Sequence, residues 1–285
     1  MKSWPRAGRW AVYVAVAIAF AIICGVLSHW QFTRNEQREH ANALIADNYD
    51  ADPVPLDDLI SGTDDFDAGD EWRPVVVEGE YLAGEQVLAR NRAQGNTSAY
   101  EVLVPFQLED GRILVIDRGW APPSYDGGAE DVPAPPEGET TVVARLKPSE
   151  ALPSSGRSAP DGQVPTIHVP SIAAQTGEET ITPAYAIMVS EDPAPAQAPN
   201  ALSAPEQDPG PHLSYAIQWI LFAIMGFAFI GYMIRTEIHA ARDDEPHEDD
   251  EDDLEGFLPE RPKPQRKKRR DLDAEEEDAI LDARR

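Results

Sequence analysis

Two uncharged, apolar stretches constrain the fold of this chain more than any other feature. The first runs from Trp10 to Thr33 and the second from Pro209 to Ile234, and neither contains Asp, Glu, Lys or Arg. A helix of about 20 residues crosses the hydrocarbon core of a bilayer, which is about 30 Å thick. Trp10 and Trp30 would stand about 30 Å apart on a helix, a spacing that suits aromatic residues at two membrane interfaces. The sequence therefore predicts two transmembrane helices.

Basic residues flank the apolar stretches on the sides that face away from the middle of the chain. Lys2, Arg6 and Arg9 precede the first stretch, and Arg235 and Arg242 follow the second. Because basic flanks stay on the cytoplasmic side during insertion, we expect a multi-pass protein of the cell (plasma) membrane. The expected parts are a cytoplasmic N-terminus at 1–9, transmembrane helices at 10–30 and 212–234, an external mainly β domain with its linker at 31–211, and a disordered, charged cytoplasmic tail at 235–285.

A cleaved signal peptide is the alternative interpretation of the first apolar stretch. The apolar region of a signal peptide has about 7–15 residues, and the stretch Ala11–Leu27 is longer. No A-x-A site follows it, and residues 21–23, which precede Cys24, are too bulky for a lipoprotein cleavage signal. These features favour an uncleaved anchor. Because Cys24 is the only cysteine and lies within the predicted span, the external domain must fold without disulfides.

The segment between the two spans contains short runs of β-branched and aromatic residues, which are typical of strands. Strands are expected at 72–81, 100–108, 113–116, 140–146 and 184–189. Val102, Val104 and Phe106 would share one face, residues 113–116 would be covered on both faces, and Glu109-Asp110-Gly111 would form a hairpin turn. Because no long helix separates these runs, the predicted fold class is a mainly antiparallel sheet or partly closed barrel between two transmembrane helices.

Other segments of the middle region read as helices or loops. The helix of the first span should continue through residues 31–46, whose residues are mostly good helix formers, and short helices are expected at 56–60 and 171–175. Pro, Gly and Ser favour loops at 122–138 and 148–162. Residues 192–211, rich in Pro and Ala, predict an extended linker to the second span.

The charge of the chain excludes one class of partner. The net charge is −27, and residues 31–211 carry 32 Asp plus Glu against 10 Lys plus Arg, so we expect no binding of nucleic acid. The basic run Arg261–Arg270 resembles a nuclear signal or a nucleic-acid patch in isolation. Its acidic flanks favour a solvated tail instead, and contact with anionic membrane lipid is a further alternative.

The sequence lacks the usual signatures of an enzyme. It contains no G-x-S-x-G, H-E-x-x-H, C-x-x-C or glycine-rich phosphate loop, which are the common local signs of nucleophilic, zinc, redox and nucleotide chemistry. The many carboxylates are not singled out by their spacing and are expected to form a solvated surface. We therefore predict that the chain is not an enzyme.

One histidine stands where the second span begins. On a helix His212, Tyr215, Ala216 and Trp219 share a face, because residues three, four and seven apart stack. An imidazole at membrane depth beside aromatic rings is able to ligate haem iron, and the helix N-terminus favours haem propionates or another anion. The alternative is that His212 and Tyr215 are interfacial residues that bond to lipid head groups or to the backbone.

Small residues recur along both spans. Ala17, Ala21 and Gly25 are four residues apart in the first span, and the second span has Ala216, Ala223 and Gly226. Stripes of small residues allow two helices to approach closely. The pattern predicts that the two spans pack together, and an oligomeric role for the stripes stays open.

Four segments, taken in order, resemble one family. These are Trp30-Gln31-Phe32-Thr33-Arg34 at the end of the first span, Trp72–Tyr81 (WRPVVVEGEY), Val104-Pro105-Phe106 with Leu114–Pro122 (LVIDRGWAP), and His212–Trp219 (HLSYAIQW). They are similar to the motifs of the surfeit-locus assembly factors for haem-copper cytochrome c oxidase, over residues 25–232. Asp117 stands where that family more often has Asn, and Gly210-Pro211 stand where it usually shows Asn residues.

The resemblance implies an assembly factor for haem-copper (aa3-type) cytochrome c oxidase. Such a factor helps haem a to be inserted or retained during maturation of subunit I, so the implied partners are subunit I and the haem a synthesis machinery. His212 would then contact haem a, as a possible iron ligand, beside Tyr215 and Trp219. Arg118 could pair with a haem propionate or a partner's carboxylate; its alternative role is to cap the hairpin or pair with a local acid. A stable accessory or scaffold subunit of a respiratory membrane complex is the competing function.

Overall fold

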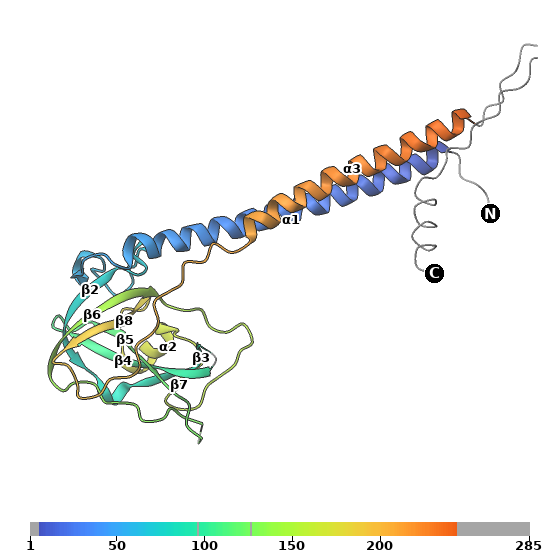
Figure 1. Ribbon diagram of the computed structural model, residues 1–285. Coiled ribbons are helices and arrows are strands. Elements are labelled where there is room, and N and C mark those ends of the chain that lie inside the picture. Colours follow the sequence, from blue (N-terminus) through green and yellow to red (C-terminus); the bar gives the residue numbers. More distant parts are fainter. Residues whose placement is uncertain (1–5, 96, 126, 244–285) are drawn as a thin grey trace, which may run out of the picture. The chain divides into compact units, whose positions relative to one another are not determined.

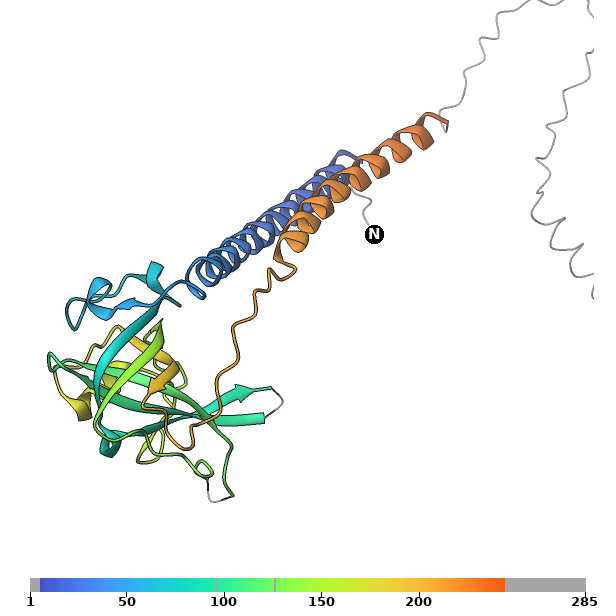
Figure 2. The same ribbon diagram turned by 60° about the vertical axis from the view of Figure 1, so that its left-hand side comes forward.

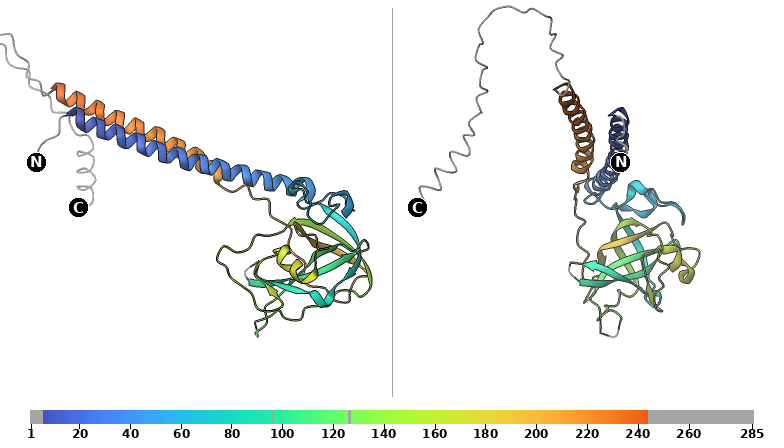
Figure 3. Two further views of the ribbon diagram at one scale, coloured as in Figure 1. Left: turned by 180° about the vertical axis from the view of Figure 1, so that it is seen from behind. Right: turned by 90° about the vertical axis from the view of Figure 1, so that its right-hand side faces the viewer.

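Two long helices lie at the ends of the part of the chain that the computed structural model describes, which comprises residues 6–95, 97–125 and 127–243. Helix α1 spans Arg6–Asn48 and helix α3 spans His212–Asp243. Both are long and apolar enough to cross a membrane, as judged by length and composition. The views in Figures 1 and 3 agree that α1 and α3 lie side by side. Gln31 meets His212 and Phe20 lies beside Gly226, so the two helices run antiparallel.

Helix α1 extends well beyond its apolar stretch. It ends at Asn48, which confirms the predicted helical continuation through residues 31–46. The side chain of Asn48 donates to the backbone oxygens of Gly69 and Glu71, at 2.7 and 2.9 Å. The end of α1 is thereby tied to the segment that leads into the first long strand.

Helix α3 also extends beyond its predicted span. The sequence predicted a disordered tail from residue 235, which is wrong for residues 235–243, because α3 continues to Asp243. Residues such as Ile238 and Ala240 favour helix, and a helix that is already formed adds further residues at little cost. The rest of the predicted tail, with the basic run at 261–270, lies outside the described residues.

The segment between the helices forms one eight-stranded sheet in the order β1-β2-β6-β8-β5-β4-β3-β7. The long strands are β2 (Pro74–Tyr81), β3 (Val87–Gln94), β4 (Thr97–Leu108), β5 (Ile113–Ala121), β6 (Glu139–Pro148) and β8 (Ala184–Asp192). The short elements are β1 (Val54–Pro55), β7 (Gln163–Val164), the 3-10 helices η1 (Leu56–Asp58), η2 (Ala68–Asp70) and η3 (Ala83–Glu85), and helix α2 (Val169–Thr176).

Strands β2, β6, β8, β5 and β4 form a closed ring of pairings, and Figure 2 shows the sheet curled into a barrel. Strand β2 pairs with β6 on one edge and with the end of β4 on the other, where Tyr81 faces Phe106. The order β6-β2-β4-β5 is a Greek key, and β8 closes the ring by pairing with β6 and, in parallel, with β5. Closure requires a glycine at position 79, because a Cβ there would lie 2.0 Å from the Gln107 carbonyl oxygen. The sequence predicted a mainly antiparallel sheet or a partly closed barrel; the domain is mainly sheet and its ring of strands is closed, with the parallel β5–β8 pair as an exception to its antiparallel pairing.

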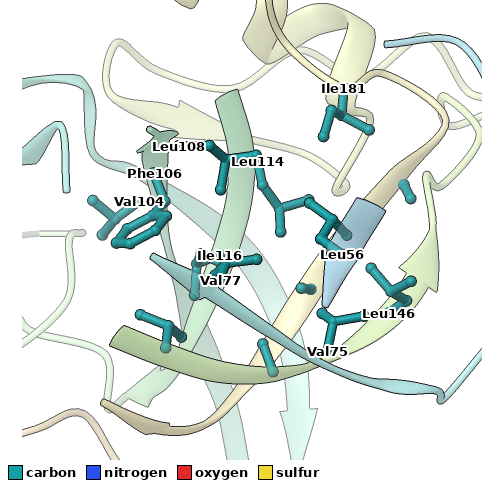
Figure 4. Packing of buried hydrophobic residues seen from close by; sticks show 14 of the residues in the cluster. Leu56, Val75, Val77, Val104, Phe106, Leu108, Leu114, Ile116, Leu146 and Ile181 are labelled. Carbon is teal, nitrogen blue, oxygen red and sulfur yellow. The ribbon is translucent and has the colours of Figure 1, made fainter. Parts of the chain in front are cut away.

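Apolar side chains fill the barrel and a second layer outside it. The interior cluster includes Val102, Val104 and Phe106 on one face of β4, as predicted, and Figure 4 shows several of its members. On β5, Leu114 and Ile116 point into this cluster, whereas Val115 packs outside against the layer that includes α2. The prediction that residues 113–116 are covered on both faces is thus confirmed.

The main error of the sequence-based prediction within the sheet was the omission of β3. Its sequence, VLARNRAQ, contains two Arg and one Asn and lacks the β-branched pattern of the other strands. Strand β3 forms because its backbone pairs with β4, across a bulge between Ala89 and Arg92. The predicted strands, the hairpin turn and the helix near 171–175 are otherwise present, with boundaries that differ by up to five residues.

Candidate functional site

His212 and Gln31 meet across the helix pair. His212 is the first residue of α3, and its Nδ1 lies 2.9 Å from Oε1 of Gln31 on α1. Gln31 is half-buried, and the contact between the two side chains is partly shielded from solvent. An amide oxygen only accepts hydrogen bonds, so with Oε1 as the partner the imidazole carries its proton on Nδ1. The other ring nitrogen, Nε2, then has the lone pair that a metal ion requires.

A second polar contact joins the helices one turn further along. The Ser28 hydroxyl donates to the carbonyl oxygen of Ala216 at 2.9 Å, and both residues are buried. Ala17 and Cys24 are buried as well, whereas a Cβ at Gly25 would meet nothing within 4 Å. The predicted packing of the two spans is therefore confirmed. The predicted stripe is wrong at position 25, because the buried face of α1 continues through Cys24 and Ser28 instead.

The other predicted residues of this helix end are more open. Ala216 faces α1 and is fully buried, but Tyr215 is 44% exposed. Trp219 is half-buried and packs edge-on against Phe222, with ring centroids 5.8 Å apart. His212 and Ala216 thus lie toward α1, whereas the ring contact of Trp219 is within α3 and Tyr215 is exposed. The arrangement offers an imidazole and an indole from α3 to a flat, apolar ligand that carries a metal.

No group of three or more His, Cys, Asp or Glu side chains is placed to hold a metal ion within residues 6–95, 97–125 and 127–243. A metal held at His212 would therefore have fewer than three such protein ligands from these residues. Haem iron would fit that condition, because the porphyrin supplies four of the ligands to the iron and leaves few for the protein.

Arg118, the other predicted contact residue, lies within the β domain. Its guanidinium is fully buried and forms a two-pronged ion pair with Glu191 on β8, with nitrogen–oxygen distances of 2.6 and 3.2 Å. It also donates to the Pro133 carbonyl oxygen at 3.1 Å and lies 5.3 Å from the ring centre of Tyr81. Burial, followed by the Glu191 charge, raises the pKa of the Tyr81 hydroxyl. Arg118 therefore pairs with a local acid, and a haem propionate would reach it only by displacing Glu191.

The two residues that follow Arg118 fasten the linker to the barrel. Trp120 exchanges backbone hydrogen bonds of 2.8 and 2.9 Å with Asn200, and its indole Nε1 donates to the Ala201 carbonyl oxygen at 3.2 Å. Gly119 has φ 123°, and a Cβ there would lie 2.3 Å from the Asn200 oxygen. Arg118 thus forms a buried ion pair, whereas Gly119 and Trp120 hold the linker at Asn200 and Ala201. We call these contacts of Gly119 and Trp120 with the linker the linker clamp.

A partly buried cluster of charges, which the sequence analysis missed, lies outside the barrel. Arg92 on β3 donates to both oxygens of Glu150, at 2.9 and 3.1 Å, and its Nε lies 2.5 Å from Glu101 Oε2. Asp117 on β5 is 1% exposed and accepts from the Gly119 amide at 3.0 Å. We call Arg92, Glu101, Asp117 and Glu150 the outer charge cluster. No sequence signal marked these carboxylates, because their pairing depends on strands and loops that are distant in the chain.

The outer charge cluster changes the acidity of its members. Burial, and then the charge of Glu101, raises the pKa of the Asp117 carboxyl well above its ordinary value. Burial also raises the pKa of Glu101, although Arg92 opposes the change. For Glu150 burial is outweighed by hydrogen bonds from Arg92, Thr166 and Ile167, so its pKa is lowered. Asp117 therefore keeps its proton more readily than an exposed aspartate does.

A cleft of about 400 Å³ opens beside the outer charge cluster. Tyr49 and Trp72 line it, each covered by a cation: Arg145 lies 3.8 Å from the Tyr49 ring centre, and Lys147 lies 3.9 Å from that of Trp72. Lys147 also pairs with Glu71. The charged groups along this cleft are thus largely engaged with one another, which is the pattern of a structural ion-pair network.

Comparison with known proteins connects these features. The sequence profile of the SURF1 family matches residues 18–224, which include most of α1, the whole sheet and the beginning of α3. SURF1-like proteins of Mycobacterium tuberculosis and Mycobacterium bovis are 36% identical over 239 residues, covering 82% of this chain and 86% of theirs. The yeast cytochrome oxidase assembly protein SHY1 is 27% identical over 110 residues, covering 38% of this chain and 28% of SHY1. With a barrel between two apolar helices and a match over most of its length, the chain belongs to the SURF1 family.

Proposed function

We propose that this protein is an assembly factor for haem-copper (aa3-type) cytochrome c oxidase and assists the insertion or retention of haem a in subunit I. The observation that carries the proposal is the family match over residues 18–224. The yeast relative SHY1 is a cytochrome oxidase assembly protein, and its role suggests the process. The proposed partners are subunit I of the oxidase and the haem a synthesis machinery.

His212 is the residue that we propose to contact haem a, with Trp219 and Tyr215 beside it. The observation that supports this role is the hydrogen bond between Nδ1 and Gln31, which leaves Nε2 as the potential iron ligand. The N-terminus of α3 would favour the negative charge of the propionates. When bound, haem a would be the cargo of the protein, and the role of these residues would be to hold and orient it.

The experiment is a measurement of bound haem in protein that is co-expressed with the enzymes of haem a synthesis. Wild-type protein, purified in detergent, should show the red-shifted absorption of haem a. His212→Gln should lose most of it, because an amide oxygen is a poorer iron ligand than imidazole. His29→Gln is the matched control, because His29 is an exposed histidine on α1. Equal haem content in wild type and His212→Gln would reject His212 as the ligand.

The same cells separate an assembly factor from a permanent subunit. An assembly factor should be substoichiometric in the purified mature oxidase, and its loss should lower the haem a content of subunit I. A protein that remains equimolar with subunit I after purification would instead be an accessory subunit.

We further propose that both termini face the cytoplasm and that the barrel is external to the plasma membrane. The basic residues that flank the helices support this orientation. In a Cys24→Ala background, a cysteine introduced by Ser154→Cys should react with a membrane-impermeant thiol reagent in intact cells, while one introduced by Ala274→Cys should not. The reverse labelling pattern would overturn the orientation.

A further inference from the structure

The contact between Gln31 and His212 joins residues that are 181 positions apart and come from different helices. We propose that Gln31 is a positioning residue, which fixes the tautomer and the orientation of the His212 imidazole so that Nε2 is the ring nitrogen available to a ligand. The ligand class, a metal centre of haem type, rests on the proposed function. The tautomer itself does not, and it can be measured without any ligand.

The chemistry of the contact sets the position of the proton. A neutral imidazole carries one proton, on either Nδ1 or Nε2, and the hydrogen bond made by one nitrogen decides the state of the other. Gln31 presents its carbonyl oxygen to Nδ1 at 2.9 Å. Histidines that bind metals commonly donate their second ring N–H to such an oxygen, which fixes the ring and raises its basicity. Gln31 has the position and the chemistry of that second partner.

The opposite edge of the imidazole faces a residue without a side chain. A Cβ built on Gly210 would lie 3.3 Å from Cδ2 and 3.6 Å from Nε2 of His212. Gly210 has φ 65° and donates its amide to Asp208 Oδ1 at 2.8 Å, which holds the turn before α3. The two edges of the ring therefore differ: Gln31 engages Nδ1, whereas a side chain at position 210 would crowd the Nε2 edge.

The packing of the helices holds Gln31 opposite His212. One turn away, the bond from Ser28 to the Ala216 carbonyl oxygen fixes the same register, because positions 28 and 31 of α1 meet positions 216 and 212 of α3 in antiparallel order. Ala216 is fully buried, so the two backbones are close at this point. Gln31 thus reaches His212 from a backbone position that a neighbouring bond already defines.

The test is nitrogen NMR of full-length protein in detergent, labelled with 15N-histidine and free of haem. The spectra are recorded at about pH 8.5, where an ordinary imidazole with a pKa of about 6.5 is neutral. The difference between wild type and His212→Gln identifies the His212 signals among those of the six histidines. Wild type should show a protonated Nδ1 and an unprotonated Nε2. A protonated Nε2 in wild type would overturn the proposal.

Three variants distinguish positioning from a general effect on structure. Gln31→Leu removes the acceptor and should lose the fixed tautomer, whereas Gln31→Glu keeps an acceptor oxygen and should retain it. Gln37→Leu makes the same change at an exposed position of α1 and should leave the His212 signals unchanged. An unchanged tautomer in Gln31→Leu would reject the proposal, and so would loss of the tautomer in Gln37→Leu.

Haem loading then separates this proposal from the proposed function. If both hold, Gln31→Leu should weaken haem binding by about 10–100-fold, the usual effect of removing such a partner, and Gln31→Glu should rescue it. If wild type has a fixed tautomer that Gln31→Leu loses, positioning by Gln31 is supported. Equal haem content in His212→Gln and wild type would then reject only His212 as the ligand. Conversely, wild-type His212 that exchanges between its two tautomers would reject positioning by Gln31. Loss of haem in His212→Gln would in that case still support His212 as the ligand.

Discussion

The barrel and the end of the helix pair that contains His212 use polar groups in opposite ways. The barrel buries full charges and neutralises them in place, as in the pair of Arg118 with Glu191. The helix end uses neutral groups: Ser28 bonds to a backbone oxygen, and Gln31 bonds to an imidazole. The buried ion pair engages both carboxylate oxygens of Glu191 with Arg118, whereas the neutral contact at His212 engages only one of two ring nitrogens.

The difference separates residues that hold the fold from residues that can serve a ligand. Removing one partner of a buried ion pair leaves an uncompensated charge and is costly. Removing one neutral interhelical hydrogen bond costs little, because the groups involved find other partners. We therefore expect substitutions in the barrel to cost more stability than substitutions in the helix pair.

The largest effect is expected in the barrel, for Arg118→Met. The variant leaves Glu191 buried without its partner, which should lower the free energy of unfolding by about 3–5 kcal/mol. Arg157→Met is the matched control at an exposed arginine and should cost less than about 1 kcal/mol. Combining Arg118→Met with Glu191→Met should recover part of the loss. The measurement is chemical unfolding of the full chain in detergent, and a cost below about 1 kcal/mol for Arg118→Met would contradict the buried pair.

A smaller loss is expected at the linker clamp, for Gly119→Ala. Alanine at φ 123° is strained, and its Cβ would collide with the Asn200 oxygen. The variant should lose about 2–3 kcal/mol and expose residues 193–211 to protease. Gly111 has φ 92°, but no atom lies within 4 Å of a Cβ added there. Gly111→Ala should therefore lower the stability by only about 1 kcal/mol, through backbone strain, and leave the linker protected. Equal protease sensitivity in the two variants would show that the close approach at position 119 is unimportant.

A gain of stability is expected for Asp117→Asn. The raised pKa of Asp117 means that the folded state holds a proton that the unfolded state releases near pH 4. Stability is therefore lost as the pH rises from about 4 through the higher pKa of the folded protein, and it stays reduced above that pKa. Asparagine keeps the acceptor for the Gly119 amide and carries no charge, so the variant should be more stable at pH 7 by about 1 kcal/mol.

The pH profile provides the control for Asp117→Asn. Near pH 3 the aspartate is protonated in both states, so wild type and variant should have nearly the same melting temperature. The difference should appear as the pH rises and then remain constant. A variant that is less stable than wild type at pH 7 would mean that the Asp117 charge is compensated by Arg92 within the outer charge cluster.

The smallest effect is expected in the helix pair, for Ser28→Ala. Loss of the bond to the Ala216 oxygen should weaken helix pairing by about 0.6 kcal/mol. Spin labels at the exposed positions Ile22 and Ile217, in a Cys24→Ala background, should show a broader distance distribution around the same mean. Thr33→Ala is the control, because Thr33 bonds within α1 to the His29 oxygen. Complete separation of the helices in Ser28→Ala would mean that this hydrogen bond contributes as much stability as the buried ion pair. The expected difference between the two regions would then be absent.

The sequence predicted those elements that depend on local pattern. Short-range patterns predicted the shared face of Val102, Val104 and Phe106 and the turn at residues 109–111. The length of the apolar stretches and their lack of charge predicted the two long helices. The family resemblance rested on four short motifs, and the comparison over residues 18–224 confirms it.

The sequence could not predict features that depend on distant pairing. Arg118 meets Glu191 at a separation of 73 residues, and Gln31 meets His212 at 181. From residue type alone, Arg118 and Gln31 each had several possible partners. The closed barrel and the antiparallel helices determine which partner lies within reach. Strand β3 was missed for the same reason, because its pairing with β4 outweighs its own weak preference for strand.

The linker clamp also has a consequence for the helix pair. Between the end of β8 at Asp192 and the start of α3 at His212, the chain would form a free loop of about 20 residues, but the clamp at Trp120 and Asn200 leaves only about 10 of them free. The entropy lost on closing a loop grows with the logarithm of its length, and halving that length saves about 0.6 kcal/mol. Fastening the linker to the barrel thus favours the docking of α3 on α1 by about as much as one interhelical hydrogen bond, although Trp120 lies on the barrel and acts only through the length of the linker.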